Sequence, residues 1–450
     1  MAFAKPSGQG QSKWPSALRA LRHRNYQLFF GGQLISLIGT WMQTVAQSWL
    51  VYRLTGSAAL LGFVGFASQI PVFLLAPLGG AAADRYTRRR ILIATQTLLM
   101  TLAGVLSVLT FSGLVRVWHL FVIASLAGAV NAFDIPARQA FVVEMVGRDD
   151  LVNAIALNSS MFNGARIVGP AVAGILLAAV GEAWCFFSNA VSFLAVIAGL
   201  LMMQVKRAPG ARAQGPALRR ILDGFRFVAR TRPVRGLLLL LGLASLMGMP
   251  YAVLMPIFAD RILRGGPDGL GILMGASGVG ALAGALTLAM RKSLKGLGSW
   301  VAYASASFGV CLILFSLSRS FWLSAALLVP IGFSMMLQMA SSNTLIQSMV
   351  PDELRGRVMA VYSMMFMGMA PFGALMAGTL AEYFDAPFAV MIGGVACIAG
   401  ALIFRLRLPS MRSEARRLII AQQAPGGGLA EEATDSGTAA ALPSTRGQAA

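Results

Sequence analysis

The sequence is poor in charge, and acidic residues are the scarcest charged type. Only 12% of the 450 residues are charged, whereas a soluble domain usually has about 25% charged residues. The 37 Lys and Arg outnumber the 17 Asp and Glu, which gives a net charge of +20. A chain that is 57% hydrophobic could not present a wettable globular surface with so few charges, which excludes an ordinary soluble domain.

Histidine and cysteine are also scarce, and their positions exclude several kinds of chemistry. His23 and His119 are far apart in the sequence, and Cys185, Cys311 and Cys397 lie singly in apolar segments. This spacing provides neither a Cys-x-x-Cys motif nor a metal-ligand cluster, so we expect no metal and no cofactor. The sequence also lacks a P-loop and any acid–base or nucleophile constellation, so we expect neither an ATPase nor another enzyme.

What the sequence has in abundance is long apolar runs, each near or above the ~20 residues that cross a bilayer as a helix. They fall at about 26–52, 57–83, 89–112, 117–143, 151–180, 183–205, 236–260, 267–290, 298–318, 321–349, 356–382 and 386–404. The pattern predicts an all-α membrane protein with twelve transmembrane helices in two six-helix bundles. The boundary between 298–318 and 321–349 is the least distinct.

An internal repeat relates the two halves of the chain. The window 144–176 aligns without a gap to 348–380, and eleven positions are identical, among them Gly164 with Gly368 and Gly174 with Gly378. Each copy is an apolar span that follows a short charged loop. Parallel repeats in a membrane chain indicate a transporter whose site lies between the halves.

The basic residues mark one side of the membrane. They gather in the N-terminus, in the loop after the second span and in the central stretch, whereas the opposite face has only Arg53, Arg116, Arg261, Arg264 and Arg319. The positive-inside rule then places both termini in the cytoplasm, in a multi-pass protein of the bacterial inner membrane. Because the basic residues are dispersed among membrane spans, we expect no nucleic-acid partner.

The same pattern predicts the domain organisation. We expect a cytoplasmic N-terminus over 1–25, bundles over 26–205 and 236–405, a linker over 206–235, and a disordered tail over 406–450. The linker has an apolar stripe with arginines around it, which predicts an amphipathic helix on the anionic inner leaflet; an ordinary cytosolic connector would also fit. The stripe consists of Leu218, Ile221, Leu222, Phe225 and Val228.

Three sequence motifs carry a resemblance to a known family. The loop over 80–90, Gly-Ala-Ala-Ala-Asp-Arg-Tyr-Thr-Arg-Arg-Arg, resembles the signature loop of the major facilitator superfamily, with Thr87 in place of the usual second glycine. The stretches 131–141 and 351–358 look like the branch that contains the enterobactin exporter and related efflux carriers. The resemblance covers about residues 18–405 and implies the superfamily fold, with a substrate between the two bundles.

The resemblance also implies a cytoplasmic latch that forms and breaks during alternating access. It assigns this role to Asp84, Arg85 and Arg88, while a purely topological role stays open. Asp84 could also cap the following helix. Asp134 and Arg138 are spaced i, i+4, so they can pair on one helix face. We predict that they belong to the latch network, and Asp134 is the candidate for proton coupling; a static bridge is the alternative.

Arg166 is the sharpest candidate for substrate contact. It falls near the middle of the fifth span, where a cation is costly unless it is paired or faces water. A structural salt bridge, or hydrogen bonds to the carbonyls at Gly169-Pro170, is the alternative. The other candidate substrate residues are Asn158, Asn163, Gln33, Gln43, Gln47, Gln338, Asn343 and Met365. Met365 belongs to a methionine-rich stretch over 335–376, and flexible methionines suit a pocket that accepts several shapes.

These observations together predict a secondary transporter that works by alternating access. We expect export of small amphipathic or anionic molecules, siderophore-like or drug-like, with protons as the coupling ion. Membrane lipid is the other expected partner, and we expect a monomer. An importer, a lipid flippase of the same fold and a non-transporting scaffold or sensor are the alternatives.

Overall fold

The protein is all-helical over the residues that its structure, a computed structural model, describes: 16–147, 149–204, 217–291 and 293–423. A short 3-10 helix over Ser16–Arg22 precedes the first long helix. The first half contains α1 (Arg24–Thr55), α2 (Ala58–Arg85), α3 (Arg88–Phe111), α4 (Val117–Val146), α5 (Leu151–Ala179) and α6 (Glu182–Met202). The second contains α7 (Ala217–Arg230), α8 (Arg232–Leu243), α9 (Met255–Ile257), α10 (Gly266–Ala289), α11 (Leu297–Leu317), α12 (Phe321–Met349), α13 (Asp352–Met367), α14 (Ala370–Tyr383) and α15 (Ala386–Gln423).

Eleven helical stretches in the described part of the chain are long and apolar enough to cross a membrane. The sequence predicts twelve, and the missing one is α1. Its 32 residues are sufficient by length, but glutamine, serine and threonine side chains lower its hydropathy. These polar residues form one face of α1, and this face lines the cavity of the candidate site.

The second half is less regular than the first. The span that begins with α8 continues through two π-helical turns, Ala244–Gly248 and Phe258–Ile262, before it ends. The next-to-last span is interrupted between α13 and α14. The prediction of disorder from residue 406 is wrong for 406–423, which continue α15; residues 424–450 lie outside the described part. Most of the predicted N-terminal segment, 1–15, also lies outside it.

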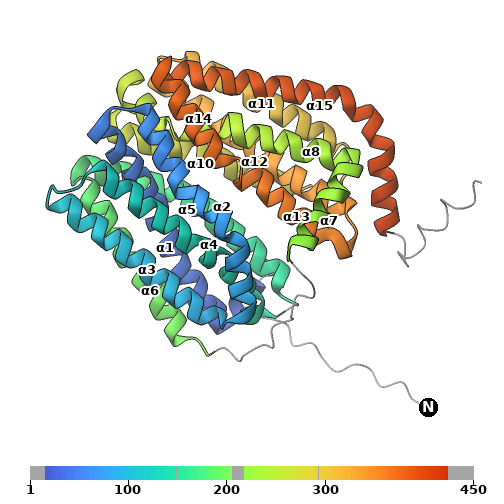
Figure 1. The fold of residues 1–450 in the computed structure, drawn as a ribbon, viewed down its shortest axis with the longest axis horizontal. Helices are drawn as coiled ribbons and strands as arrows, with labels where there is room; N and C mark the ends of the chain where they lie inside the picture. The colour runs from blue at the N-terminus through green and yellow to red at the C-terminus, as the bar shows by residue number, and fades with distance from the viewer. Residues whose placement is uncertain (1–15, 148, 205–216, 292, 424–450) are drawn as a thin grey trace, which may run out of the picture.

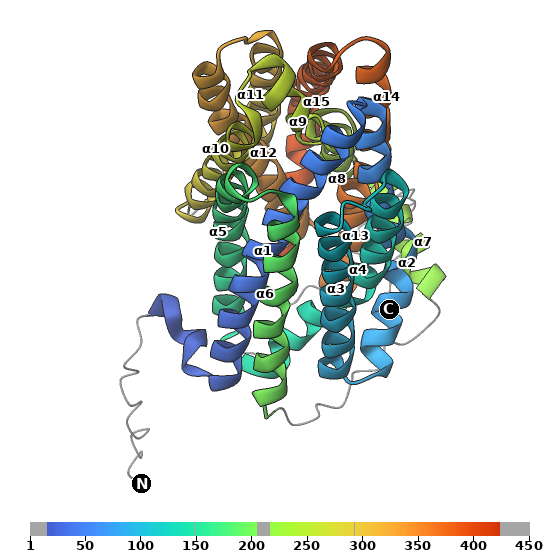
Figure 2. The ribbon, with the colours of Figure 1, turned by 90° about the vertical axis from the view of Figure 1, so that its left-hand side faces the viewer.

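The two halves pack by the same plan. In the first half α2 packs on α4 and α3 on α6, and in the second half α10 packs on α12 and α11 on α15. Figure 1 shows α1 and α3–α6 on one side of the molecule and α8, α11, α12 and α15 on the other. The main contacts between the halves are also reciprocal, since α5 packs on α10 and α14 packs on α2. Figure 2 shows α1, α5 and α6 running side by side.

Paired glycines bring the halves together at one end of the molecule, where α2 begins and α5 ends. A Cβ on Gly271 would lie 2.8 Å from the Cα of Gly174, and a Cβ on Gly378 would lie 2.7 Å from the Cα of Gly62. Gly174 and Gly378 are equivalent in the repeat. Small residues let two membrane helices approach backbone to backbone, so these two crossings close this end symmetrically.

Hydrogen bonds lock the same end. Ser57 Oγ donates to a Glu382 carboxylate oxygen at 3.0 Å, and the backbone N–H of Ala59 donates to the same oxygen at 3.1 Å. The Tyr52 hydroxyl donates to Asp260 at 3.1 Å. Within the described ranges, every hydrogen bond between the halves that involves a side chain lies here. The halves are therefore joined at this end and not at the end that carries the 80–90 loop.

The linker helix α7 packs along α13, as part of the second half. Arg357 Nη1 donates to Asp223 at 2.9 Å, and Val228 is buried in the apolar cluster of this half. Of the predicted stripe, Leu222 and Phe225 stay exposed. One side of α7 is therefore held by protein, while two large apolar side chains remain on its outer side; the linker segment 205–216 lies outside the described residues.

At the opposite end, Asp150 ties the N-terminal 3-10 helix to α5. Its side chain is buried and accepts from Arg19 Nε at 2.8 Å and pairs with Arg22 and His23. The hydrogen bond with His23 is the largest cause that lowers the pKa of Asp150 to about 2 from 3.8, and Arg19 and Arg22 add to it against the opposing effect of burial.

This shift predicts a pH-dependent contribution to stability. The pKa of Asp150 is lower in the folded than in the unfolded protein, so its ionised form stabilises the fold. This contribution is present above about pH 4 and is lost as the pH falls toward about 2. We expect Asp150→Asn to lower the melting temperature at pH 7 and the difference from the parent to vanish in acid. Melting curves of both proteins between pH 2 and 7 test this, and a pH-independent difference would contradict it.

Candidate functional site

A cavity of about 460 Å³ lies among the helices of the first half, with Met367 of α13 as its one described lining residue from the second half. Its polar lining from α1 consists of Gln33, Ser36, Thr40, Gln43, Thr44 and Gln47. These positions recur every three or four residues, which places them on one face of a helix. The polar face of α1 thus points into the cavity while its other faces pack on apolar neighbours.

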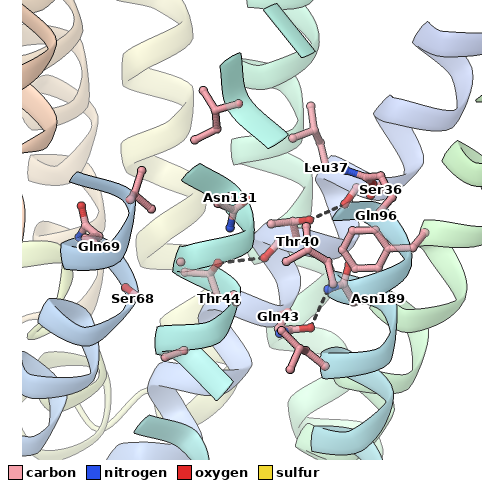
Figure 3. Close-up of a pocket in the computed structure, with 18 of the residues that line it drawn as sticks. Ser36, Leu37, Thr40, Gln43, Thr44, Ser68, Gln69, Gln96, Asn131 and Asn189 are labelled. Carbon is pink, nitrogen blue, oxygen red and sulfur yellow. Dashed lines mark hydrogen bonds between the residues drawn. The ribbon is translucent and has the colours of Figure 1, made fainter. Parts of the chain in front are cut away.

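Neighbouring helices complete the polar lining. Figure 3 shows Ser68 and Gln69 of α2, Gln96 of α3, Asn131 of α4 and Asn189 of α6 around the stripe of α1. Asn189 Nδ2 donates to Gln43 Oε1 at 2.6 Å, which fixes both amides. The hydroxyls of Thr40 and Thr44 donate to backbone carbonyls one turn earlier, at 2.8 and 2.9 Å. The lining offers amide groups for hydrogen bonding, set among apolar side chains.

A buried carboxylate lies behind this lining. Asp134 of α4 is fully buried and accepts from Thr95 Oγ1 at 2.7 Å and from Gln96 Nε2 at 2.8 Å. It also forms the i, i+4 ion pair with Arg138 that the spacing predicts. A buried ion is tolerated when it is paired and its remaining lone pairs are satisfied, and both conditions hold for Asp134.

Arg138 and Gln96 connect this carboxylate to the cavity, because both line it. Arg138 is the one charged side chain among the described residues of the lining. Arg138 Nε and Gln96 Oε1 are buried and have no hydrogen-bond partner in the described part of the chain. A buried donor without a partner is costly, so these two atoms are available to a ligand or to water in the cavity.

Arg166 does not line this cavity. Its guanidinium carbon lies 5.8 Å from the centroid of the Trp41 ring, a cation–π contact. No carboxylate pairs with it within the described residues, so the structure offers no salt bridge to explain it. Its backbone carbonyl lies 3.0 Å from where a Cβ on Gly278 would be, so Arg166 stands where α1, α5 and α10 meet, at the boundary between the halves.

The other predicted substrate residues divide into two groups. Gln33, Gln43 and Gln47 line the cavity, as described. Asn158 accepts from the Tyr26 hydroxyl at 3.0 Å, and Asn163 Nδ2 donates to the carbonyl of Ser159 at 2.8 Å. Both asparagines are therefore engaged within the first half and do not line the cavity.

The predicted residues of the second half are likewise away from the cavity. Gln338 is buried and donates to the carbonyl of Leu240 at 3.4 Å, and Asn343 accepts from Gln347 at 2.5 Å. Met365 packs with the apolar cluster of the second half. Sequence reasoning missed Ser68, Gln69, Gln96, Asn131 and Asn189; each is a polar residue in an otherwise apolar span, a signal equal to the one that identified the α1 glutamines.

The 80–90 loop is anchored by two of its arginines. Arg88 Nη1 lies 2.6 Å from Glu144 of α4 in a largely buried ion pair, and Arg89 donates to the carbonyls of Leu200 and Leu201 at 2.6 and 2.9 Å. Asp84 and Arg85 are exposed, and neither has an ion-pair partner among the described residues. Asp84 lies in the last turn of α2 and does not cap α3, whose N-cap is Thr87.

The described residues contain no cluster of three or more His, Cys, Asp or Glu side chains that could hold a metal. Cys185, Cys311 and Cys397 are unpaired thiols. The candidate site therefore consists of the cavity lining, with the Asp134–Arg138 pair behind it.

Comparison with known proteins identifies the class of molecule. The family described as "transmembrane secretion effector" matches residues 15–437. The staphyloferrin A transporter of Staphylococcus aureus is 27% identical over 84% of this chain and 94% of its own length. The multidrug efflux pump Tap of Mycolicibacterium fortuitum is 29% identical over 76% of this chain and 86% of its own.

Solved structures show the same fold at lower identity. The nucleoside transporter NupG superposes with a TM-score of 0.66 at 15% identity, over 86% of this chain and 98% of its own. A bacterial homologue of the lysosomal transporter Spinster, in an inward-facing and unoccupied conformation, superposes with a TM-score of 0.65 at 14% identity, over 92% of this chain and 100% of its own.

Proposed function

Because this chain belongs to the transmembrane secretion effector family of the major facilitator superfamily, we propose that it exports small amphipathic or anionic molecules by alternating access. The cavity is the observation that carries this proposal. It combines an amide-rich polar face with apolar walls and Arg138, a lining that suits a neutral or anionic amphipathic solute. The two relatives named for staphyloferrin A and multidrug efflux support siderophore-like or drug-like substrates.

The joint between the halves supports the alternating-access part of the proposal. The paired glycines and the Glu382 and Asp260 hydrogen bonds join the halves at one end, and no side-chain hydrogen bond of the described residues joins them at the other. Breaking these contacts and joining the opposite end would move the cavity from one side of the membrane to the other. Asp84 and Arg85, which are exposed in this state, are the groups we assign to the latch at that opposite end, with Arg88 as its fixed part.

We further propose that protons drive the transport and that Asp134 carries them. Its carboxylate is shielded from solvent, and Arg138 and Gln96 lead from it to the cavity. Protonation of Asp134 would release Arg138 from the ion pair and so change the charged side chain that lines the cavity. Proton binding at Asp134 and substrate binding in the cavity would in this way be linked through Arg138, which is the coupling that proton-driven transport needs.

The test is uptake into inverted membrane vesicles, with and without an imposed pH gradient. The panel contains a carboxylate siderophore, a hydrophobic cation and a neutral drug. We expect uptake of the siderophore or the neutral drug, faster with the vesicle interior acidic. An uptake rate that is the same with and without the pH gradient would exclude proton coupling. Accumulation only in right-side-out vesicles would show that the protein imports its substrate.

With α1 counted as the first span, we propose that the chain forms twelve transmembrane helices in two groups of six and acts as a monomer. This predicts that both termini are cytoplasmic, in the bacterial inner membrane. Reporter fusions after residue 115 should read periplasmic, and fusions after 215 or 440 should read cytoplasmic. A periplasmic signal from residue 215 would overturn the two-bundle arrangement.

Arg166 yields a separate prediction, since we propose that it contacts substrate when the halves part. No acid is left unpaired when this charge is removed, so Arg166→Gln should melt within a few degrees of the parent. It should nevertheless lose transport of anionic substrates, and Arg166→Lys should keep part of it because the charge remains. The melting temperature and the rate of anion transport are measured on the same purified variants. Unchanged anion transport by Arg166→Gln would show that Arg166 does not contact the substrate.

A further inference from the structure

A second hollow, separate from the transport cavity, lies on the second half at the end opposite the glycine crossings. Its volume is about 830 Å³. It is bounded by the beginnings of α8 and α11, the end of α12 and the last turns of α15. The wall is apolar: Leu294, Ile419 and Ile420 are partly exposed or exposed, and behind them lie the buried side chains of Leu237, Leu345, Met349, Phe404, Leu408 and Met411. The transport proposal does not use this groove.

The rim of the groove is basic. Lys295, Arg412 and Arg416 line it, and none of the described lining residues is acidic. All three side chains belong to exposed residues, and none has a carboxylate partner in the described part of the chain. Three unneutralised cations beside an apolar wall match a ligand that has an anionic head and an apolar body.

The rim is held in place by the protein. Arg412 Nη2 donates to Ser299 Oγ at 3.0 Å, at the start of α11. Lys295 lies in a tight turn that Gly296 permits with a φ of 76°, and Arg291 Nε donates to the carbonyl of Ser293 at 2.9 Å in the same turn. Arg416 follows Arg412 by one helical turn, so both lie on the same side of α15.

The last turns of α15 have the form of an interfacial helix. Pro409 lies inside α15, and Figure 1 shows the helix turning before its end, so that its last part runs across the ends of the neighbouring helices. Ala415, Leu418 and Ile419 pack on the apolar cluster of the second half, which leaves the arginines on the remaining face. Such a basic amphipathic segment lies at the headgroup level of a membrane.

We propose that this groove binds one anionic phospholipid. Its phosphate contacts Lys295, Arg412 and Arg416, and an acyl chain lies along the apolar side chains of Leu294, Ile419 and Ile420. The lipid then joins α15 to α11 and α12 at the membrane surface. A free phosphate would satisfy the rim but leave the apolar wall uncovered, so the occupant that fits both is a phospholipid. Binding itself does not depend on the direction or the substrate of transport.

Lipid binding to the purified full-length protein tests the proposal. The probes are phosphatidylglycerol, phosphatidylcholine with the same acyl chains, and inorganic phosphate, each titrated in detergent and followed by native mass spectrometry and by melting temperature. We expect phosphatidylglycerol to bind one-to-one and to raise the melting temperature, and the other two to do neither. The triple variant Lys295→Gln/Arg412→Gln/Arg416→Gln should bind it about a hundredfold more weakly, at about 1 kcal/mol for each charge.

Two further variants separate the groove from bulk charge. Arg226→Gln/Arg230→Gln/Arg417→Gln removes the same charge from exposed positions outside the groove, so its affinity should equal that of the parent. Ala415→Trp keeps every charge but fills the groove, so it should lose binding while its lipid-free melting temperature shows that it is folded. Equal weakening in both triple variants, or full binding by Ala415→Trp, would overturn the proposal, and so would an equal response to inorganic phosphate.

Discussion

Arg138→Gln is expected to abolish transport and to destabilise the protein more than Asp134→Asn does. The Asp134 carboxylate is fully buried, whereas the Arg138 side chain keeps 24% of its exposure beside the cavity. Removing the arginine leaves a buried carboxylate without its counter-charge, a loss of about 3–5 kcal/mol. Removing the carboxylate leaves a cation that water in the cavity can reach, so the loss of stability should be smaller.

The double variant and a surface pair provide the controls. Asp134→Asn/Arg138→Gln removes both charges, so it should regain much of the lost stability but no transport. Arg355→Gln breaks an exposed i, i+3 pair with Asp352, and it should cost about 1 kcal/mol or less and leave transport intact. Transport and denaturation are measured on the same preparations. A double variant that transports normally would exclude the Asp134–Arg138 pair from the mechanism.

Gly378→Leu should arrest the transport cycle in a folded protein. A Cβ at this position would lie 2.7 Å from the Cα of Gly62 and 2.7 Å from the carbonyl of Ala58, both backbone atoms that cannot move aside. The joined state is therefore overpacked by about 3 kcal/mol, which shifts the population away from it by more than about a hundredfold. Gly271→Leu at the other crossing, where a Cβ would lie 2.6 Å from the carbonyl oxygen of Pro170, should act in the same way.

Cysteine labelling reports the shift directly. In a background without the three native cysteines, Ala58→Cys places a thiol where the native residue is 5% exposed, so an impermeant maleimide reaches it only when this end opens. Labelling should be slow alone and fast with Gly378→Leu. Gly104→Leu is the matched control, because a Cβ there meets nothing within 4 Å. Slow labelling in the Gly378→Leu protein would show that the glycine crossings do not hold this end closed.

Local features of the chain were predictable from the sequence. The apolar runs define helices because a bilayer permits little else, and a spacing of four residues is sufficient to bring Asp134 and Arg138 together. The continuation of α15 to Gln423 was missed, since low hydropathy after residue 405 indicated a tail. Its arginines and leucines instead form an amphipathic helix on the second half, a pattern that hydropathy alone does not separate from disorder.

The composition of the cavity could not be predicted in the same way. The α1 glutamines were found because they are polar residues in an apolar span, but their partner Asn189 comes from α6, far along the chain. The sequence places Arg166 near the middle of its span but does not tell which way it faces, and in the structure its guanidinium lies over the ring of Trp41 rather than in the cavity lining. The face of a helix that lines a cavity is decided by the helices that pack against it. The position of a residue along its span gives its depth in the membrane but not the direction of its side chain.

The sequence by itself determined that this chain is a membrane transporter with two related halves. The length of the apolar runs, the positions of the charges and the internal repeat can all be read from the order of residues along the chain. Only the tertiary structure decided where those halves meet, which polar residues share a cavity, and that Glu144 rather than a more distant acid pairs with Arg88. These features depend on the packing of helices that are remote in sequence. Close packing is set by the shapes of both surfaces at once, and glycines such as Gly62 and Gly378 acquire their role only through each other.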